Sequence, residues 1–248
     1  MVLRVVVSAC FWIFMTLSSA VMYPIAVGIR IATFPFDRQL RLLHRFTSFW
    51  GSLYTRCNPI WSVEIRGREN IPSIDTPCVI VANHQSFADI LVLFRLTLHY
   101  KWVSKRENFR APFIGWNMTL NRYIPITRGT TKGNLQMMRA CEGALKEGNS
   151  LMMFPEGTRS PDGTMRAFKD GAFELALRAE CPILPIVIEG TAQALSKGGM
   201  LLGWSRNILV TILPALPYAR FSHLAARDVN RMVWNVMAAQ LNMQQRGG

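Results

Sequence analysis

The sequence has few acidic residues and few cysteines for its length. Its 248 residues include 15 Asp and Glu against 28 Lys and Arg, which leaves a formal net charge of +13. Half of the residues are hydrophobic, so the chain lacks the low hydrophobicity that, with high net charge, marks a disordered polycation. The composition indicates a folded protein that meets an anionic surface. Charge alone does not distinguish a membrane from a nucleic acid.

The five cysteines are scattered and form no Cys-x-x-Cys pair. An odd number of unclustered thiols argues against a disulfide framework and favours a reducing compartment. The four histidines show no metal-ligand spacing, so we expect no metal site. The chain also lacks repeats and low-complexity linkers. Its length fits one α/β domain with an appendage.

Residues 5–29 contain no charged side chain. As one helix this stretch would be roughly 37 Å long, which exceeds the hydrocarbon core of a bilayer, about 30 Å thick. Pro24 is expected to divide the helix and to leave residues 5–23 as the better membrane segment. A buried core helix and a signal peptide cleaved near Ala20 are the alternatives. Apolar residues continue past Ala20, which argues against cleavage.

Four arginines follow this stretch against a single aspartate, and by the positive-inside rule they keep the rest of the chain on the cytoplasmic side. Aromatic residues between 46 and 61 suit the headgroup level of a membrane. We predict that residues 1–61 form a membrane-anchoring helical segment, either a span with an interfacial helix or two helices within one leaflet. Residues 62–248 would then form an α/β domain. The arginines are Arg30, Arg38, Arg41 and Arg45.

From residue 78 onward, short apolar runs alternate with amphipathic stretches. This alternation predicts an α/β fold, with a mostly parallel sheet flanked by helices. Ligands of such folds bind at the carboxyl ends of strands. The predicted strands are residues 78–82, 101–103, 123–126, 150–154, 183–188 and 208–212, and the predicted helices are residues 87–98, 112–120, 132–147, 171–179 and 227–245.

The first candidate motif, residues 83–89, reads Asn-His-Gln-Ser-Phe-Ala-Asp and follows a predicted strand. The Asp89 carboxylate can accept a hydrogen bond from one ring nitrogen of His84, which leaves the other nitrogen to take a proton from a substrate hydroxyl. No nucleophilic serine with its own base is nearby, so the pair suits direct transfer to that hydroxyl. Ser86 and Asp89 also fit a helix-capping box, in which Asp89 only stabilises the helix start. The two roles are compatible.

The second candidate motif, residues 154–160, reads Phe-Pro-Glu-Gly-Thr-Arg-Ser and follows another predicted strand. Gly157 permits close backbone approach, Thr158 offers a hydroxyl, and the Arg159 guanidinium matches a phosphate. Arg128 also follows a predicted strand. Two arginines at strand ends can converge on one phosphate dianion. A Gly/Pro loop with solvated charges is the alternative.

Together these motifs resemble those of the glycerolipid acyltransferases. Residues 83–89 resemble the family's N-H-x4-D motif and residues 154–160 its F-P-E-G-T-R-S motif, while residues 112–116, 124–128 and 183–188 resemble three further segments in the family's order. The resemblance covers roughly residues 65–215. It implies transfer of a fatty acyl chain from coenzyme A or acyl carrier protein to a lysophospholipid hydroxyl, usually giving phosphatidic acid. The acyl thioester is then a substrate, and no cofactor is expected.

The resemblance also implies residue roles. His84 becomes the general base and Asp89 its orienting carboxylate. The substrate-binding residues become Lys105, Arg128, Glu156, Gly157, Thr158 and Arg159.

We therefore expect a membrane-bound acyltransferase with its catalytic domain on the cytoplasmic side of a bacterial inner membrane. Its partners would be the bilayer, lysophosphatidic acid, and acyl-CoA or acyl carrier protein, and not nucleic acid. One alternative is an acyltransferase for another lysolipid, such as a lyso-ornithine lipid. A membrane-tethered module that binds anionic lipid or nucleic acid is an alternative of a different class.

Overall fold

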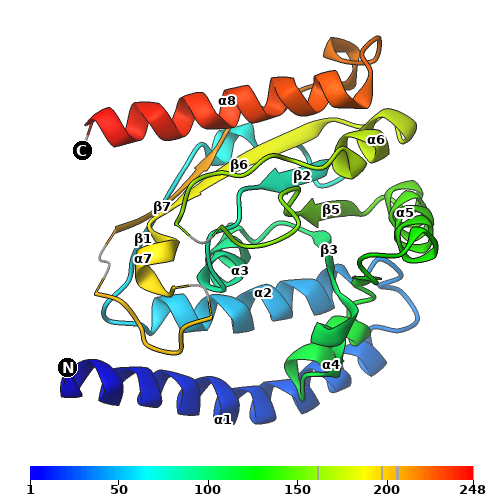
Figure 1. Ribbon diagram of the computed structural model, residues 1–248. Helices are drawn as coiled ribbons and strands as arrows, with labels where there is room; N and C mark the ends of the chain where they lie inside the picture. Colours follow the sequence, from blue (N-terminus) through cyan, green and yellow to red (C-terminus); the bar gives the residue numbers. More distant parts are fainter. Residues whose placement is uncertain (161, 197, 205–206, 248) are drawn as a thin grey trace.

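The computed structural model describes residues 1–160, 162–196, 198–204 and 207–247. Two helices at the N-terminus, α1 (Val2–Ala32) and α2 (Arg41–Arg56), precede a seven-stranded sheet (Figure 1). The strands are β1 (Ser62–Arg66), β2 (Val79–Ala82), β3 (Tyr100–Lys105), β4 (Ile124–Ile126), β5 (Ser150–Met153), β6 (Ile183–Glu189) and β7 (Asn207–Ile212). The other α-helices are α3 (Ala88–Leu93), α4 (Ile114–Leu120), α5 (Thr131–Lys146), α6 (Gly171–Arg178), α7 (Thr191–Ala194) and α8 (Ala226–Gly247).

The strand order is β1-β7-β6-β2-β5-β3-β4. Neighbouring strands are parallel, except that β6 and β7 are antiparallel. The predicted mostly parallel α/β fold is therefore confirmed. Each predicted strand and helix of residues 78–245 is present with slightly different ends, the helix expected at residues 87–98 as α3 and a following 3-10 turn (Phe94–Leu96).

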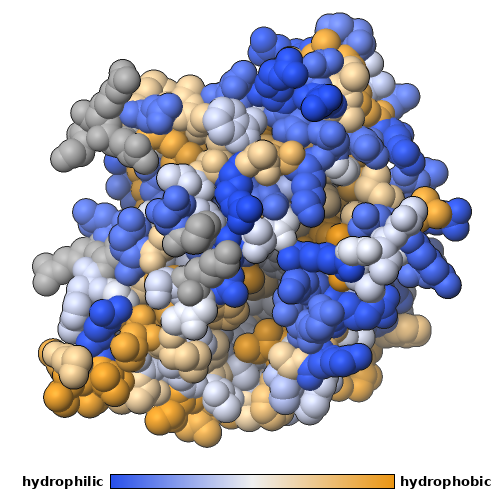
Figure 2. Space-filling view, viewed as in Figure 1, coloured by the Kyte–Doolittle hydropathy of each residue, from blue (hydrophilic) through white to orange (hydrophobic). Residues whose placement is uncertain are grey.

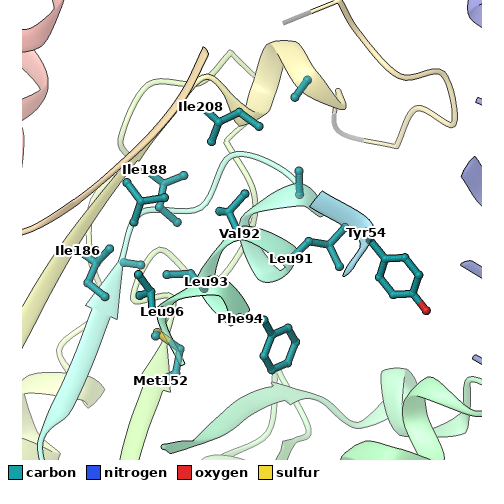
Figure 3. Close-up of a cluster of buried hydrophobic side chains, with 14 of the residues drawn as sticks. Tyr54, Leu91, Val92, Leu93, Phe94, Leu96, Met152, Ile186, Ile188 and Ile208 are labelled. Carbon is teal, nitrogen blue, oxygen red and sulfur yellow. The ribbon is translucent and has the colours of Figure 1, made fainter. Parts of the chain in front are cut away.

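Helices cover both faces of the sheet, and the side chains of the fully buried central strand β2 alternate between the two layers. Ile80 and Ala82 belong to the core cluster that contains residues of α1, α2 and α3. Val79 and Val81 belong to the cluster formed with α5, α6 and α8. Figure 3 shows part of the first layer, in which α3 side chains approach those of β6 and β7. Burial on both faces explains the continuous apolar runs in the sequence.

The helix α1 runs through Pro24 without a break, so the predicted division at this residue is wrong. Proline removes one backbone hydrogen bond from a helix, but tertiary packing holds the helix on both sides of it. Past Pro24, Ala26 is buried with Leu40 and Leu43. The ring of Tyr23 lies 5.5 Å from that of Trp116 in α4, and the Tyr54 hydroxyl of α2 hydrogen-bonds to Ser18 and Ser19.

The aromatic residues of α2 also differ from expectation. The aromatic residues between 46 and 61 were predicted to suit the membrane surface, yet Trp50 and Tyr54 of α2 are buried in the core, as is Trp61 beyond its end, while Phe49 is exposed. The helix is amphipathic as expected, but its aromatic face packs on α1 and α3. Aromatic residues bury large apolar areas, so a protein core satisfies them as well as a headgroup layer does.

Candidate active site

The two predicted motifs meet because β2 and β5 are adjacent parallel strands. Their carboxyl ends lie at the same edge of the sheet, and strands β3 and β4 follow β5 along that edge. Neighbouring strands are about 4.8 Å apart. His84 follows β2, residues 154–159 follow β5, Lys105 ends β3, and Arg128 lies just beyond β4. Four consecutive strand ends therefore bring together residues that are far apart in the sequence.

His84 and Asp89 form the predicted pair. The Nδ1 atom of His84 lies 2.7 Å from Oδ2 of Asp89, whose carboxylate is buried. Because a carboxylate only accepts hydrogen bonds, Nδ1 carries the proton and Nε2 keeps its lone pair. The same Oδ2 atom accepts hydrogen bonds from the backbone N–H groups of Gln85 and Ser86, at 2.7 and 2.8 Å. Asp89 thus caps the start of α3 and orients His84 at once.

Two further contacts restrict His84. Its imidazole stacks on the ring of Phe154, with centroids 3.9 Å apart and planes inclined by 9°. Asn83, the preceding residue, exchanges two hydrogen bonds with the backbone of Ile188 in β6, at 2.8 and 2.7 Å. The end of β2 is therefore fixed to β6 on one side, while the imidazole is held by a residue that follows β5. The sequence did not predict this role of Phe154, because an aromatic residue at the end of a strand cannot be distinguished from a core residue by its position in the pattern.

Glu156 lies behind the site and is absent from the described residues that line the cavity. Its carboxylate is buried and accepts hydrogen bonds from the backbone N–H of His84 at 2.7 Å and of Arg166 at 3.2 Å. The backbone N–H of Ser160 donates to the carbonyl of His84 at 2.8 Å. Glu156 thus joins the two motifs. This geometry fits a positioning residue better than the substrate-binding role implied by the family resemblance.

The ionisation of Glu156 leads to a prediction for stability. Burial raises the pKa of its carboxyl from 4.5 to about 7, even though the backbone N–H donors of His84 and Arg166 act in the opposite direction. Below pH 4.5 the group is protonated in the folded and unfolded chains, and as the pH rises to 7 only the unfolded chain loses its proton readily. The free energy of unfolding therefore falls over this interval, by up to about 3 kcal/mol at 1.36 kcal/mol per pKa unit.

Replacing Glu156 with Gln should remove this part of the pH dependence. We expect the free energy of unfolding of the wild-type chain to fall relative to that of Glu156→Gln between pH 4.5 and 7, and their difference to be constant above pH 7. Denaturant unfolding of both chains across this range measures it. Glu69→Gln, at an exposed residue, is the matched control. A difference that does not vary with pH would contradict the raised pKa of this carboxyl.

A cavity of about 520 Å³ opens in front of His84, a volume ordinary for a ligand site. One part of its wall is polar and contains His84, Lys105, Arg128, Thr158 and Arg159, together with Gly157. The structure thus brings six of the eight predicted site residues to one cavity, with Asp89 and Glu156 behind them. Another part is apolar and is formed by residues of the first four helices, among them Met15, Trp50, Tyr54, Leu91 and Met118.

The charge of the polar wall is positive. Lys105, Arg128 and Arg159 all lie on it. Burial lowers the pKa of Arg128, with Glu107 acting in the opposite direction. Gly157 has a φ of +71°, which favours glycine. The exposed Lys169 lies next to Gly157, because a Cβ placed on this glycine would be 3.1 Å from Nζ of the lysine. Lys169 is therefore a fourth cation beside the motif. No spacing in the sequence pointed to Lys169. The arrangement offers a base, an anion site and an apolar compartment side by side.

Comparisons with known proteins agree with this arrangement. The acyltransferase family model matches residues 62–189. A chloroplastic 1-acyl-sn-glycerol-3-phosphate acyltransferase, BAT2 from Brassica napus, is 37% identical over 190 residues, which are 76% of this chain and 55% of that protein. The 1-acyl-sn-glycerol-3-phosphate acyltransferase of Limnanthes alba is 32% identical, over 78% of this chain and 69% of its own length. The enzyme of the same name from Pseudomonas aeruginosa is 38% identical, over 62% of this chain and 58% of its own length.

A solved structure shares the whole fold. The crystal structure of the 1-acyl-sn-glycerophosphate (LPA) acyltransferase PlsC from Thermotoga maritima has a TM-score of 0.82 to this chain, covering 98% of this chain and 97% of that one at 21% identity. The chain spans about half the length of the first curated relatives that it matches. The family model covers its residues from β1 through β6, including both motifs and the cavity wall between them. The chain therefore belongs to the acyltransferase family.

Proposed function

We propose that this protein is a membrane-associated 1-acyl-sn-glycerol-3-phosphate acyltransferase, which moves a fatty acyl chain from an acyl thioester to the sn-2 hydroxyl of lysophosphatidic acid. The observation that carries the proposal is the cavity itself. His84, which is hydrogen-bonded to Asp89 behind it, lines the same cavity as three cations and an apolar compartment. The product would be phosphatidic acid. The matched proteins whose names contain 1-acyl-sn-glycerol-3-phosphate support this choice of acceptor.

The chemistry uses this chain's own residues. Nε2 of His84 takes the proton of the acceptor hydroxyl as its oxygen attacks the thioester carbonyl carbon. When the tetrahedral intermediate collapses, the carbon–sulfur bond breaks, and the thiolate leaves and receives the proton from His84. Asp89 stabilises the imidazolium that exists between the two transfers. No enzyme nucleophile is required, because the substrate hydroxyl attacks directly.

The cations of the polar wall would hold the phosphate of the acceptor. Arg128 and Arg159 come from the ends of β4 and β5, two elements that lie on either side of β3 in the sheet. Guanidinium groups bind phosphate oxygens bidentately. Lys105, from β3 between them, would add a point charge. The positions of these cations suit a phosphate and leave the group beyond it unspecified, so a lyso-ornithine acceptor would need contacts of its own.

The N-terminal helices would place this cavity at a membrane. In the part of the chain that the structure describes, α1 is the one helix long and apolar enough to cross a bilayer. It packs along the domain, as Arg4 and Trp12 donate hydrogen bonds to the carbonyls of Leu202 and Met200. Its opposite side exposes a row of apolar residues, which Figure 2 shows as the hydrophobic lower edge of the molecule. The row includes Val6, Ile13, Phe14, Leu17, Val21 and Ile25.

We infer that α1 and α2 lie within one leaflet and form the membrane-anchoring segment of residues 1–61. A helix packed against its own domain over most of its length cannot also stand across a bilayer. Met15 and Tyr54 link this segment to the cavity, because both line its apolar part. An acyl chain could then pass from leaflet to site without crossing water. The basic residues near α2 favour a cytoplasmic location at a bacterial inner membrane.

Replacing Arg159 with Ala should raise the KM of one substrate, lysophosphatidic acid, much more than that of the other. We expect the KM for lysophosphatidic acid to rise about tenfold or more, since a charge-assisted hydrogen bond contributes about 1.5–3 kcal/mol. The KM for the acyl thioester should change by less than about threefold. Steady-state kinetics with each substrate varied in turn measures both. Arg139→Ala, at an exposed position of α5, is the control, and equal effects on the two KM values would refute the assignment of Arg159 to the acceptor phosphate.

The proposal is tested with purified protein in mixed micelles. The acceptors are lysophosphatidic acid, lysophosphatidylcholine and a lyso-ornithine lipid, each with acyl-CoA and with acyl carrier protein as donor. Rapid acylation of lysophosphatidic acid alone is the expected result. Preference for another acceptor would show that lysophosphatidic acid is not the substrate. No transfer to any acceptor would favour a binding module.

A further inference from the structure

A second cavity lies at the opposite ends of strands β3 and β4 from the active site. It has a volume of about 380 Å³ and is bordered by the start of β3, the turn before β4, the C-terminal half of α5 and the loop between α1 and α2. Lys101 of β3 lines this cavity, whereas Lys105 of the same strand lines the active-site cavity. Four strand residues separate their Cα atoms by roughly 13 Å. Tyr123 borders both cavities.

Positive charge dominates this second cavity. Its described lining includes three cations, Arg38, Lys101 and Arg122, and one carboxylate, Glu147. The ion pairs formed within the described part of the chain include none of these three cations. The cavity therefore combines an open hollow with positive charge that direct ion pairs do not neutralise, and Arg38 and Arg122 at its border are exposed.

Lys101 is the most unusual of the three. It is only 4% exposed, and its Nζ atom donates hydrogen bonds to the carbonyls of Gln39 at 2.9 Å and Asn121 at 3.1 Å. Carbonyls supply no negative charge, and an ammonium has three donors. Burial and Arg122 lower the pKa of Lys101 to about 8, against the opposing effects of Asp37 and Glu147. A buried cation without a paired anion is costly, so an anion bound beside it would stabilise it.

A purely structural role for these cations must be considered, because basic side chains often satisfy carbonyls at helix C-termini. The helix α5 ends against this cavity. Its last carbonyls already accept hydrogen bonds from the backbone N–H groups of residues 147–149 and from the side chain of Gln39. The two arginines are therefore not needed to complete the end of α5.

The backbone of Arg122 is set by the end of α4. Its φ of +54° lies in the left-handed region, where glycine and asparagine are the usual residues. The conformation costs a residue with a Cβ roughly 1–2 kcal/mol. It arises from the Schellman turn that ends α4, in which the backbone N–H groups of Arg122 and Tyr123 donate to the carbonyls of Thr119 and Met118, so the case for a ligand rests on the cavity and its charges.

We propose that this second cavity binds a phosphate-bearing anion through Arg38, Lys101 and Arg122. The anion would be either the headgroup of an anionic phospholipid or soluble phosphate. Arg38 belongs to the loop between α1 and α2, which also exposes Phe34 and Phe36. That loop is part of the proposed membrane-anchoring segment of residues 1–61. The proposal goes beyond acyl transfer and does not depend on it.

The test is isothermal titration of the full chain in a neutral detergent. Arg128→Gln and Arg159→Gln are introduced first, so that phosphate binding in the active-site cavity is removed. Inorganic phosphate and a short-chain, water-soluble phosphatidylglycerol are the two probes. Arg38→Gln/Arg122→Gln is then compared with Arg220→Gln/Arg227→Gln, a control that removes the same charge from exposed residues near α8. Lys101→Met is a second, independent variant.

We expect Arg38→Gln/Arg122→Gln to weaken binding of at least one probe tenfold or more, and the control pair to change it by less than twofold. Tighter binding of the phosphatidylglycerol would identify a lipid headgroup as the ligand, and binding of inorganic phosphate alone would identify soluble phosphate. Equal weakening by both arginine pairs, or no binding of either probe to the starting chain, would overturn the proposal. If Lys101→Met lowers the melting temperature and leaves the affinity unchanged, Lys101 is structural and not part of the site.

Discussion

Replacing His84 with Ala should reduce acyl transfer about 10²- to 10⁴-fold, because general-base assistance by a positioned side chain contributes that much to a rate. The substitution removes the one imidazole that lines the active-site cavity among the described residues. It leaves the capping hydrogen bonds from Gln85 and Ser86 to Asp89 intact. We therefore expect the helix α3 and the fold to persist. The measurement is kcat at saturating acceptor and thioester.

The control for this experiment is His223→Ala, at an exposed histidine outside the cavity. Binding to vesicles and the far-ultraviolet circular dichroism spectrum should be unchanged in both variants. This separates loss of chemistry from loss of membrane association or folding. A His84→Ala chain that retains a tenth of wild-type kcat would show that another group supplies the base, and a membrane-tethered binding module would then explain the charge better.

Replacing Asp89 with Asn should lower kcat by about 10²-fold or more. Asn lacks the charge that stabilises the imidazolium, and its amide can present either an oxygen or an N–H group to Nδ1 of His84. With the N–H group facing Nδ1, the ring would adopt the wrong tautomer, with its proton on Nε2. In the other orientation, with its oxygen on Nδ1, Asn would bury its NH2 group where the Oδ1 atom of Asp89 has no hydrogen-bond partner among the described residues. An unsatisfied buried donor costs about 1–3 kcal/mol, so stability should fall as well.

Two measurements distinguish these effects for Asp89→Asn. Denaturant unfolding gives the loss of stability, and the pH profile of kcat gives the change in the base. If Asp89 only caps α3, stability will fall while kcat and its pH profile remain close to those of the wild type. Asp228→Asn, at an exposed residue of α8, is the matched control. The capping and orienting roles meet at one oxygen, Oδ2, so we expect both readouts to change together.

Periodicity predicted most of the domain because its central strands are buried on both faces. Residues 78–82 and 183–188 read as continuous apolar runs and correspond to β2 and β6. The strand β1 was not predicted from the sequence. Its residues are at most partly buried and alternate in exposure, and what fixes them is parallel pairing with β7, about 145 residues later in the chain. Short segments of this kind are specified by their partner and not by their own pattern.

The membrane segment shows the same limit. The sequence determined that residues 5–29 are apolar and long enough for a bilayer, and the structure agrees that they are helical. Whether Pro24 breaks the helix, and whether the aromatic residues of α2 meet lipid or protein, depended on α4 and the core. Local propensities set what a segment tolerates, and packing decides which of the tolerated states is adopted.

The sequence by itself determined which residues are candidates for the chemistry, since the two motifs carry the proposed base, its carboxylate and the proposed phosphate-binding Arg159 in recognisable order. Only the tertiary structure decided how they cooperate. The sheet order places four strand ends side by side, Phe154 stacks on His84, and Glu156 faces the backbone and not the cavity. The sequence shows the same glutamate whether its carboxylate faces the cavity or the backbone. Its role is set by what surrounds it, because burial and hydrogen-bond partners, which the sequence does not record, decide whether it meets substrate or backbone.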